Sequence, residues 1–177
     1  MNRIAALTAF VASLALCAPI ALADEPAHIG VRAGLETPFY THYSRGGASG
    51  SYWLGDSFQP ALDLLVEYYP GGMVSIGAEL REGFASTGSL YDRTGTAIGP
   101  SVTFDFTPLY LRLALPVHVE PSPAYLDFRP AGGLKLGSDR VAFYVEAALD
   151  FPLVGGSGVG IFDTQQVSLG AGVWLKF

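Results

Sequence analysis

Few side chains in this 177-residue chain have both the type and the spacing that chemistry requires. The three histidines, His28, His42 and His118, are far apart and form no motif with the spacing of zinc ligands. The single cysteine, Cys17, excludes an intrachain disulfide and a zinc site built from cysteines. A glycine-rich stretch at 155–160 resembles a phosphate-binding loop, but no Lys-Ser or Lys-Thr pair follows it. We therefore expect no metal site and no cofactor.

The pair His42 and Ser44 comes closest to a catalytic arrangement. One residue separates the two, so on a single strand the imidazole could activate the hydroxyl. In a polar loop the same side chains would face water, and we favour this second interpretation. The acidic pairs Asp63 with Glu67 and Asp127 with Glu146 could do acid–base chemistry, but the chain has Arg and Lys residues to match them, which favours structural ion pairs instead. We expect no enzymatic activity.

The composition narrows the class of protein. Half of the residues are hydrophobic and 15% are charged, which excludes a disordered chain. Ten Lys and Arg residues stand against 16 Asp and Glu residues, for a net charge of −6. This acidic balance argues against nucleic-acid binding, which needs a basic face. A single domain remains, either a globular β protein or a membrane protein.

Residues 1–23 have the pattern of a secretory signal peptide. Arg3 precedes a long apolar stretch, and Ala21-Leu22-Ala23 forms a small-x-small cleavage pattern. An uncleaved membrane anchor is the alternative, because the apolar run is nearly long enough to span a bilayer. Cleavage would leave one domain over residues 24–177, in which no apolar run reaches the length of a spanning helix.

Beyond the signal peptide, apolar and polar residues alternate with the period of a β-strand. In the first such segment, Ile29 and Val31 share one face, and Gly30 and Arg32 share the other. The sixth segment is the weakest, because Pro130–Gly133 interrupts its pattern. The alternation predicts eight strands, at 29–36, 62–68, 74–81, 102–106, 109–115, 125–136, 141–149 and 167–177.

The connections between these strands alternate in length. Long loops are expected at 37–58, 83–99 and 152–164. Tight turns are expected at 70–72, 107–108 and 137–140, and a connection of intermediate length is expected at 120–123. An even number of strands, with short turns at one end and long loops at the other, is typical of membrane barrels. The sequence therefore predicts an all-β fold, an antiparallel up-and-down eight-stranded transmembrane β-barrel.

Charge decides which face of the barrel meets lipid. A soluble barrel would bury the apolar face, whereas a membrane barrel exposes it. The predicted apolar face carries no charged residue, and the opposite face carries both signs in near balance. The acids of that face are Glu36, Asp63, Glu67, Glu79, Asp105, Asp127 and Glu146. The bases are Arg32, Arg81, Arg112, Arg129, Lys135 and Lys176. We expect these charges to pair inside a narrow lumen filled by side chains.

The last strand ends on an aromatic residue, with Val173, Leu175 and Phe177 at alternating positions. This ending resembles the C-terminal signal that the assembly machinery reads in bacterial outer-membrane barrels. The whole chain resembles the small outer-membrane β-barrel superfamily, including the transmembrane domain of the A-type outer-membrane protein and the opacity-type and W-type proteins. Six aromatic residues near strand ends predict interfacial girdles: Tyr68, Tyr69, Tyr110, Phe151, Trp174 and Phe177.

The resemblance implies a monomer in the bacterial outer membrane with both termini in the periplasm. Its partners would be outer-membrane lipid, including lipopolysaccharide, and the barrel-assembly machinery. The expected function is a structural or surface-interaction role through acidic extracellular loops. A narrow W-type channel is one alternative, with Pro130–Gly133 as the feature that could open it. A lipid-modifying enzyme is the other, although lipid A deacylases carry their His-x-Ser pair in a late strand, and His42 and Ser44 lie early.

Overall fold

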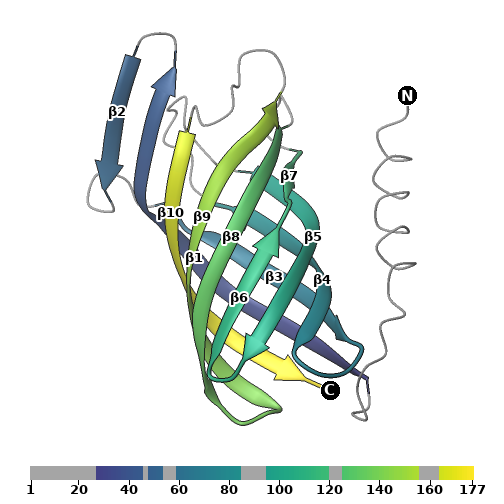
Figure 1. The fold of residues 1–177 in the computed structure, drawn as a ribbon. Coiled ribbons are helices and arrows are strands. Elements are labelled where there is room, and N and C mark those ends of the chain that lie inside the picture. The colour runs from purple at the N-terminus through teal and green to yellow at the C-terminus, as the bar shows by residue number, and fades with distance from the viewer. Residues whose placement is uncertain (1–26, 46–47, 54–58, 85–94, 120–124, 156–163) are drawn as a thin grey trace, which may run out of the picture.

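A computed structural model describes residues 27–45, 48–53, 59–84, 95–119, 125–155 and 164–177. The expected signal peptide lies outside this described part. Within the described part, no helix is long and apolar enough to cross a membrane. The strands are β1 His28–Arg45, β2 Ala48–Trp53, β3 Ala61–Tyr69, β4 Val74–Gly83, β5 Gly95–Phe106, β6 Leu109–Ala114, β7 Val117–His118, β8 Tyr125–Gly137, β9 Val141–Gly155 and β10 Thr164–Lys176 (Figure 1).

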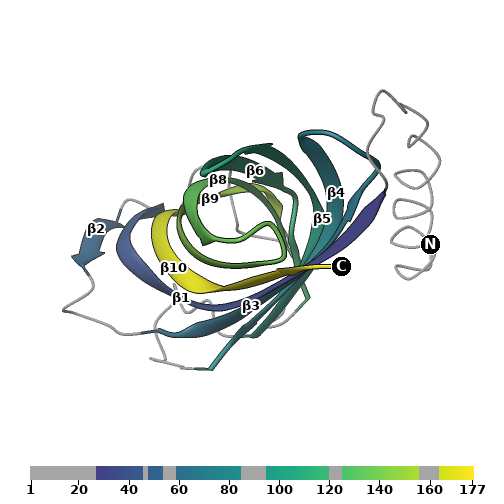
Figure 2. The ribbon, with the colours of Figure 1, turned by 90° about the horizontal axis from the view of Figure 1, so that it is seen from below.

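The strands form one antiparallel sheet that closes on itself (Figure 2). Neighbours in sequence pair around the wall, and β1 pairs with β10 from Gly30 opposite Lys176 to Tyr43 opposite Thr164. β6 and β7 occupy one position in the wall, because both pair with β5 and with β8. β2 pairs with β1 alone and is not part of the wall. The wall therefore has eight strands, which confirms the predicted fold class.

The two faces of the wall differ in chemistry, as the alternation predicts. Large apolar side chains point outward, and Leu35 and Phe143 are 61% and 67% exposed. Arginines point inward, and Arg32, Arg112 and Arg129 are fully buried. A soluble barrel would show the reverse arrangement, so the distribution fits a wall that faces lipid.

Glycines shape the wall where a side chain would collide. At Gly34, an added Cβ would lie 2.2 Å from the hydroxyl oxygen of Tyr144 and 2.6 Å from the carbonyl oxygen of Ala171. The glycine therefore gives the Tyr144 ring room inside the lumen. At the short turn after β3, Gly72 has a φ of +73°, a conformation that residues with a Cβ rarely adopt.

All three segments expected as long loops contain strand residues, and in the one expected at 152–164 β9 extends to Gly155 and β10 begins at Thr164. Residues 37–58 include the end of β1 and all of β2, which form a hairpin paired from Tyr40 opposite Trp53 to Arg45 opposite Ala48. In Figure 1 this hairpin stands beside the upper part of the barrel. The loop expected at 83–99 is also shorter, because β5 begins at Gly95. Gly99, the last residue of that expected loop, serves close packing: a Cβ there would lie 2.2 Å from the Leu115 carbonyl oxygen.

The sixth predicted strand is continuous. Pro130–Gly133 lie within β8, where Pro130 pairs with Leu113 and Gly133 pairs with Tyr110. The ladder between β8 and β9 passes from Phe128 opposite Phe151 to Ala131 opposite Ala148 without a change of register. The interruption that the sequence suggested is therefore not a break in the wall.

Candidate functional site

The lumen is the site where the described polar residues gather. Nearest the end with the long connections, two arginines share two carboxylates. Arg129 contacts Glu36 and lies 2.8 Å from the Oδ1 of Asp150. Arg81 lies 3.1 Å from the Oε1 of Glu36 and 3.3 Å from the same Asp150 oxygen. All of these side chains are buried, so each guanidinium replaces water as the partner of the carboxylates.

His118 joins this upper cluster. Its Nε2 lies 2.9 Å from the Oδ2 of Asp127 and 3.2 Å from the Nη2 of Arg81. Its ring stacks on Tyr125 with a centroid distance of 4.1 Å and an angle of 7° between planes. The imidazole is therefore wedged among a carboxylate, a guanidinium and an aromatic ring, and it is 2% exposed.

Arg112 is the hub of the middle of the lumen. It contacts Glu79 and Glu146 at ion-pair distance, and its Nη2 lies 3.7 Å from the Oδ2 of Asp63. Arg32 reaches Glu146 from the opposite wall at 2.7 Å. Because Arg112 is fully buried and contacts three carboxylates, this cluster spans the barrel and fills its centre.

Aromatic rings surround Arg32 toward the short-turn end. Its guanidinium lies 4.4 Å from the ring centroid of Tyr144, 4.7 Å from that of Tyr110 and 5.7 Å from that of Trp174. Tyr69, Tyr110 and Trp174 are all nearly fully buried, so the expectation that they form interfacial girdles is wrong. Their positions on the inward-facing side of their strands explain the correction. Tyr68 and Phe177, by contrast, are 46% and 73% exposed.

Glu67 lies at the same level and differs from the other buried acids. The hydroxyls of Tyr69 and Ser75 donate to its carboxylate at 3.1 and 2.9 Å. In the described structure no arginine or lysine forms an ion pair with it. Hydroxyl donors therefore take the place of a cation at this position.

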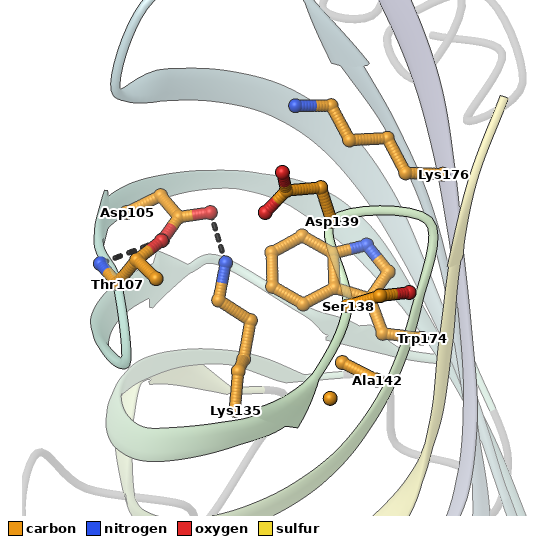
Figure 3. A pocket seen from close by; sticks show the side chains of 9 residues that line it. Asp105, Thr107, Lys135, Ser138, Asp139, Ala142, Trp174 and Lys176 are labelled. Carbon is orange, nitrogen blue, oxygen red and sulfur yellow. Dashed lines mark hydrogen bonds and ion pairs between the residues drawn. The ribbon is translucent and has the colours of Figure 1, made fainter.

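Asp105 and Lys135 lie at the short-turn mouth, apart from the central network. They form an ion pair beside a cavity of about 90 Å³ (Figure 3). The Nζ of Lys135 also lies 3.6 Å from the ring centroid of Trp174. Lys176 reaches over the ring of Tyr69, with 4.9 Å between its Nζ and the centroid. The mouth is thus lined by both charges and aromatic rings.

The structure adds two residues that the sequence reasoning missed. Asp150 and His118 are buried in the lumen, although neither was assigned to its charged face. A signal existed for both. Asp150 continues the inward positions of the strand that carries Tyr144 and Glu146, and His118 continues those of the strand that carries Arg112. Extending the alternation past the expected strand ends would have found them.

The charges inside the lumen do not balance. Four arginines are buried there: Arg32, Arg81, Arg112 and Arg129. Seven acids are buried with them: Glu36, Asp63, Glu67, Glu79, Asp127, Glu146 and Asp150. Among the described residues, no three His, Cys, Asp or Glu side chains are grouped so that they could hold a metal ion. Arginines, hydroxyls and His118 form ion pairs or hydrogen bonds with these acids. This arrangement is typical of a structural network that fills the lumen.

His42 and Ser44 lie on the outside of the hairpin. The register between β1 and β10 shifts at Phe39, so Tyr40 pairs with Val167 after Pro38 pairs with Ser168. This bulge moves the even-numbered residues of β1 from the lumen face to the outer face. His42 and Ser44 therefore lie in β1 and not in a polar loop, and they do not continue the inward face that carries Arg32 and Glu36. Its Nδ1 contacts the Oγ of Ser51 at 3.1 Å.

No protein-family model and no curated protein sequence matches the chain. The crystal structure of Neisserial surface protein A matches it with a TM-score of 0.60 and 16% identity, over 86% of this chain and 100% of that one. The chain has the fold of a small outer-membrane β-barrel. The crystal structure of Ail, the attachment invasion locus protein of Yersinia pestis, in complex with the heparin analogue sucrose octasulfate, has a TM-score of 0.45 and 12% identity, over 86% of this chain and 100% of that one.

Proposed function

We propose that this chain is an integral protein of the bacterial outer membrane with a structural or surface-interaction role. The carrying observation is the distribution of side chains, with apolar groups on the outside and ion-paired arginines inside. Every strand of a closed barrel has two neighbours, so the backbone can cross lipid without an unpaired edge. The fold shared with Neisserial surface protein A supports this location.

The surface role would belong to the end with the long connections. Loops on a rigid barrel tolerate variation and commonly carry function. Acidic residues are expected there, among them Asp56, Glu82, Asp92 and Asp163. We propose that the protein acts as a monomer in contact with outer-membrane lipid. For its assembly we propose recognition of Val173, Leu175 and Phe177, of which Phe177 is the most exposed.

A shift in gel mobility is the first result expected from this proposal. The unboiled protein should migrate differently from the boiled one, because a closed barrel keeps its compact form in detergent. The measurement is electrophoresis of outer-membrane and soluble fractions with and without heating. A soluble periplasmic protein without a mobility shift would contradict the proposal and would favour a carrier barrel.

We expect the reconstituted barrel to show no stepped single-channel conductance. Arg32, Arg112 and Arg129 are buried with their carboxylates across the lumen, which leaves no room for a continuous water column at their level. Planar-bilayer recording checks this, with a larger porin in the same bilayer as the positive control. Discrete steps from the purified barrel would instead support the channel alternative.

A further inference from the structure

The outer face of the β1–β2 hairpin joins aromatic rings to hydrogen-bonding groups. We call this set the outer hairpin face: Phe39, Tyr40, His42, Ser51 and Trp53. Trp53 pairs with Tyr40, and Ser51 pairs with His42, so cross-strand partners share a side of the hairpin. Tyr40 also pairs with Val167, which belongs to the outward positions of β10 together with Leu169. The face is therefore on the same side as the lipid-facing wall.

The aromatic part of this face is open to its surroundings. The rings of Tyr40 and Trp53 lie 4.7 Å apart at 52°, and Phe39 meets Trp53 edge-on at 5.6 Å and 87°. Trp53 is nevertheless 56% exposed and Phe39 is 39% exposed. Exposed aromatic side chains held in a fixed cluster are typical of binding surfaces rather than of a core.

The polar part centres on one hydroxyl. The Oγ of Ser51 lies 3.0 Å from the hydroxyl of Tyr40 and 3.1 Å from the Nδ1 of His42. These groups can each donate and accept hydrogen bonds. Among the described side chains of this face there is no carboxylate, ammonium or guanidinium. The face thus offers neutral hydrogen bonding beside aromatic rings.

The face lies at the depth where lipid headgroups begin. A membrane-spanning β-strand needs about 9–11 residues. Counted from Ile29, the first exposed apolar residue of β1, that length ends at residues 37–39. Phe39 is the last apolar residue of β1, and hydroxyl and imidazole groups follow it. The outer hairpin face therefore continues the lipid-facing wall into the headgroup layer.

We propose that the outer hairpin face binds the sugar headgroup of a glycolipid in the outer leaflet. This inference rests on the proposed membrane location. The rings of Tyr40 and Trp53 present flat surfaces for the C–H faces of a sugar, and Ser51 and His42 provide partners for its hydroxyls. A phosphate group would need cations, which the described side chains of this face lack. Continuity with the lipid-facing wall selects a lipid-anchored sugar over a free one.

Quenching of Trp53 fluorescence by iodide tests the proposal. The chain has two tryptophans, and Trp174 is 4% exposed in the lumen, so iodide reaches mainly Trp53. The folded full-length barrel is reconstituted in phosphatidylcholine vesicles with or without a neutral glycolipid that carries a two-hexose headgroup. The glycolipid should reduce the quenching of Trp53 by iodide. The Trp53→Phe variant shows how much of the fluorescence comes from Trp53. The same two-hexose sugar, free in solution, distinguishes a soluble ligand from the lipid.

Variants give the second arm, with glycolipid binding to the barrel measured by flotation of labelled glycolipid micelles. Trp53→Ala should weaken binding about tenfold, as expected for an aromatic anchor. Ser51→Ala should weaken it less. Phe143→Ala is the matched control, because it removes an aromatic ring near the short-turn end that is 67% exposed, against 56% for Trp53.

The outcomes separate this inference from the proposed function. Equal quenching with and without glycolipid, in a barrel that shows the mobility shift, would overturn the inference alone. Equal protection by the free sugar would overturn the assignment to a lipid. Loss of binding in Phe143→Ala as large as in Trp53→Ala would also overturn it. Failure of the protein to enter vesicles would overturn both the inference and the proposed function.

Discussion

Replacing Arg112 by alanine should destabilise the barrel by about 3–5 kcal/mol, because it removes one partner of a buried ionic cluster. Arg112 contacts Glu79, Glu146 and Asp63, and it is fully buried. In the variant, Glu146 would still form its ion pair with Arg32, and Glu79 would still form its ion pair with Arg129. Asp63 would lose the one ion pair that it forms within the described residues, which is with Arg112. A buried carboxylate would remain uncompensated.

Equilibrium unfolding in urea, followed in detergent or lipid vesicles, measures this effect. Arg112→Lys should have an intermediate effect, since it keeps the charge but loses the forked geometry of the guanidinium. Arg140→Ala is the control, because Arg140 is exposed in a short turn. Asp63→Asn added to Arg112→Ala should restore part of the loss, because it neutralises the carboxylate that Arg112 leaves without an ion pair. A change below about 1 kcal/mol in Arg112→Ala would show that water screens the lumen as it does at a surface.

An arginine on the outer wall should be nearly as damaging. Val145 lies midway along the apolar face of β9 and is 49% exposed. Val145→Arg should reduce the free energy of unfolding in vesicles by about 2–4 kcal/mol, the effect of a cation at the bilayer midplane. The physical reason is that lipid cannot solvate the guanidinium, whereas water would.

This substitution tests whether lipid covers the outer wall. Val145 is on the outside of this barrel, so if water covered the wall in place of lipid, the change would be within about 0.5 kcal/mol. Ser138→Arg serves as the control, because Ser138 is exposed in the turn between β8 and β9 and lies beyond the apolar wall. Equal stability of Val145→Arg and Ser138→Arg in vesicles would contradict a lipid-facing wall.

The alternation of apolar and polar residues predicted the barrel because successive side chains of each strand point to its outer surface and into its lumen in turn. Outward Leu35 and inward Arg32 have opposite chemistry, so period two shows both the strand and its orientation. The inward charges were recognised for the same reason. Their partners were not, because pairs such as Arg32 with Glu146 join strands 114 residues apart in the sequence. Only the closed topology brings them together.

Other features leave no local signal. The bulge at Phe39 reverses the orientation of every residue after it in β1. A phenylalanine is equally compatible with a regular strand and with a bulge, so the residue type does not reveal the shift. Trp174 and Tyr110 suggested an interfacial belt by type, whereas their even positions placed them inside. For these two residues the side-chain type predicted the membrane interface and the position in the strand predicted the lumen, and the prediction from position was correct. A strand beginning at Gly95 was hidden because small residues that permit close packing also suggest a loop.

The pairing of β1 with β10 sets the order of events in assembly. This seam joins the first and the last described strands, so its contacts have the largest sequence separation among the described strand pairs. Until β10 arrives, one edge of β1 has unpaired amide and carbonyl groups along more than ten residues. The barrel can therefore close only when β10 is present, and until then the longest described strand is paired with a wall neighbour along one edge alone.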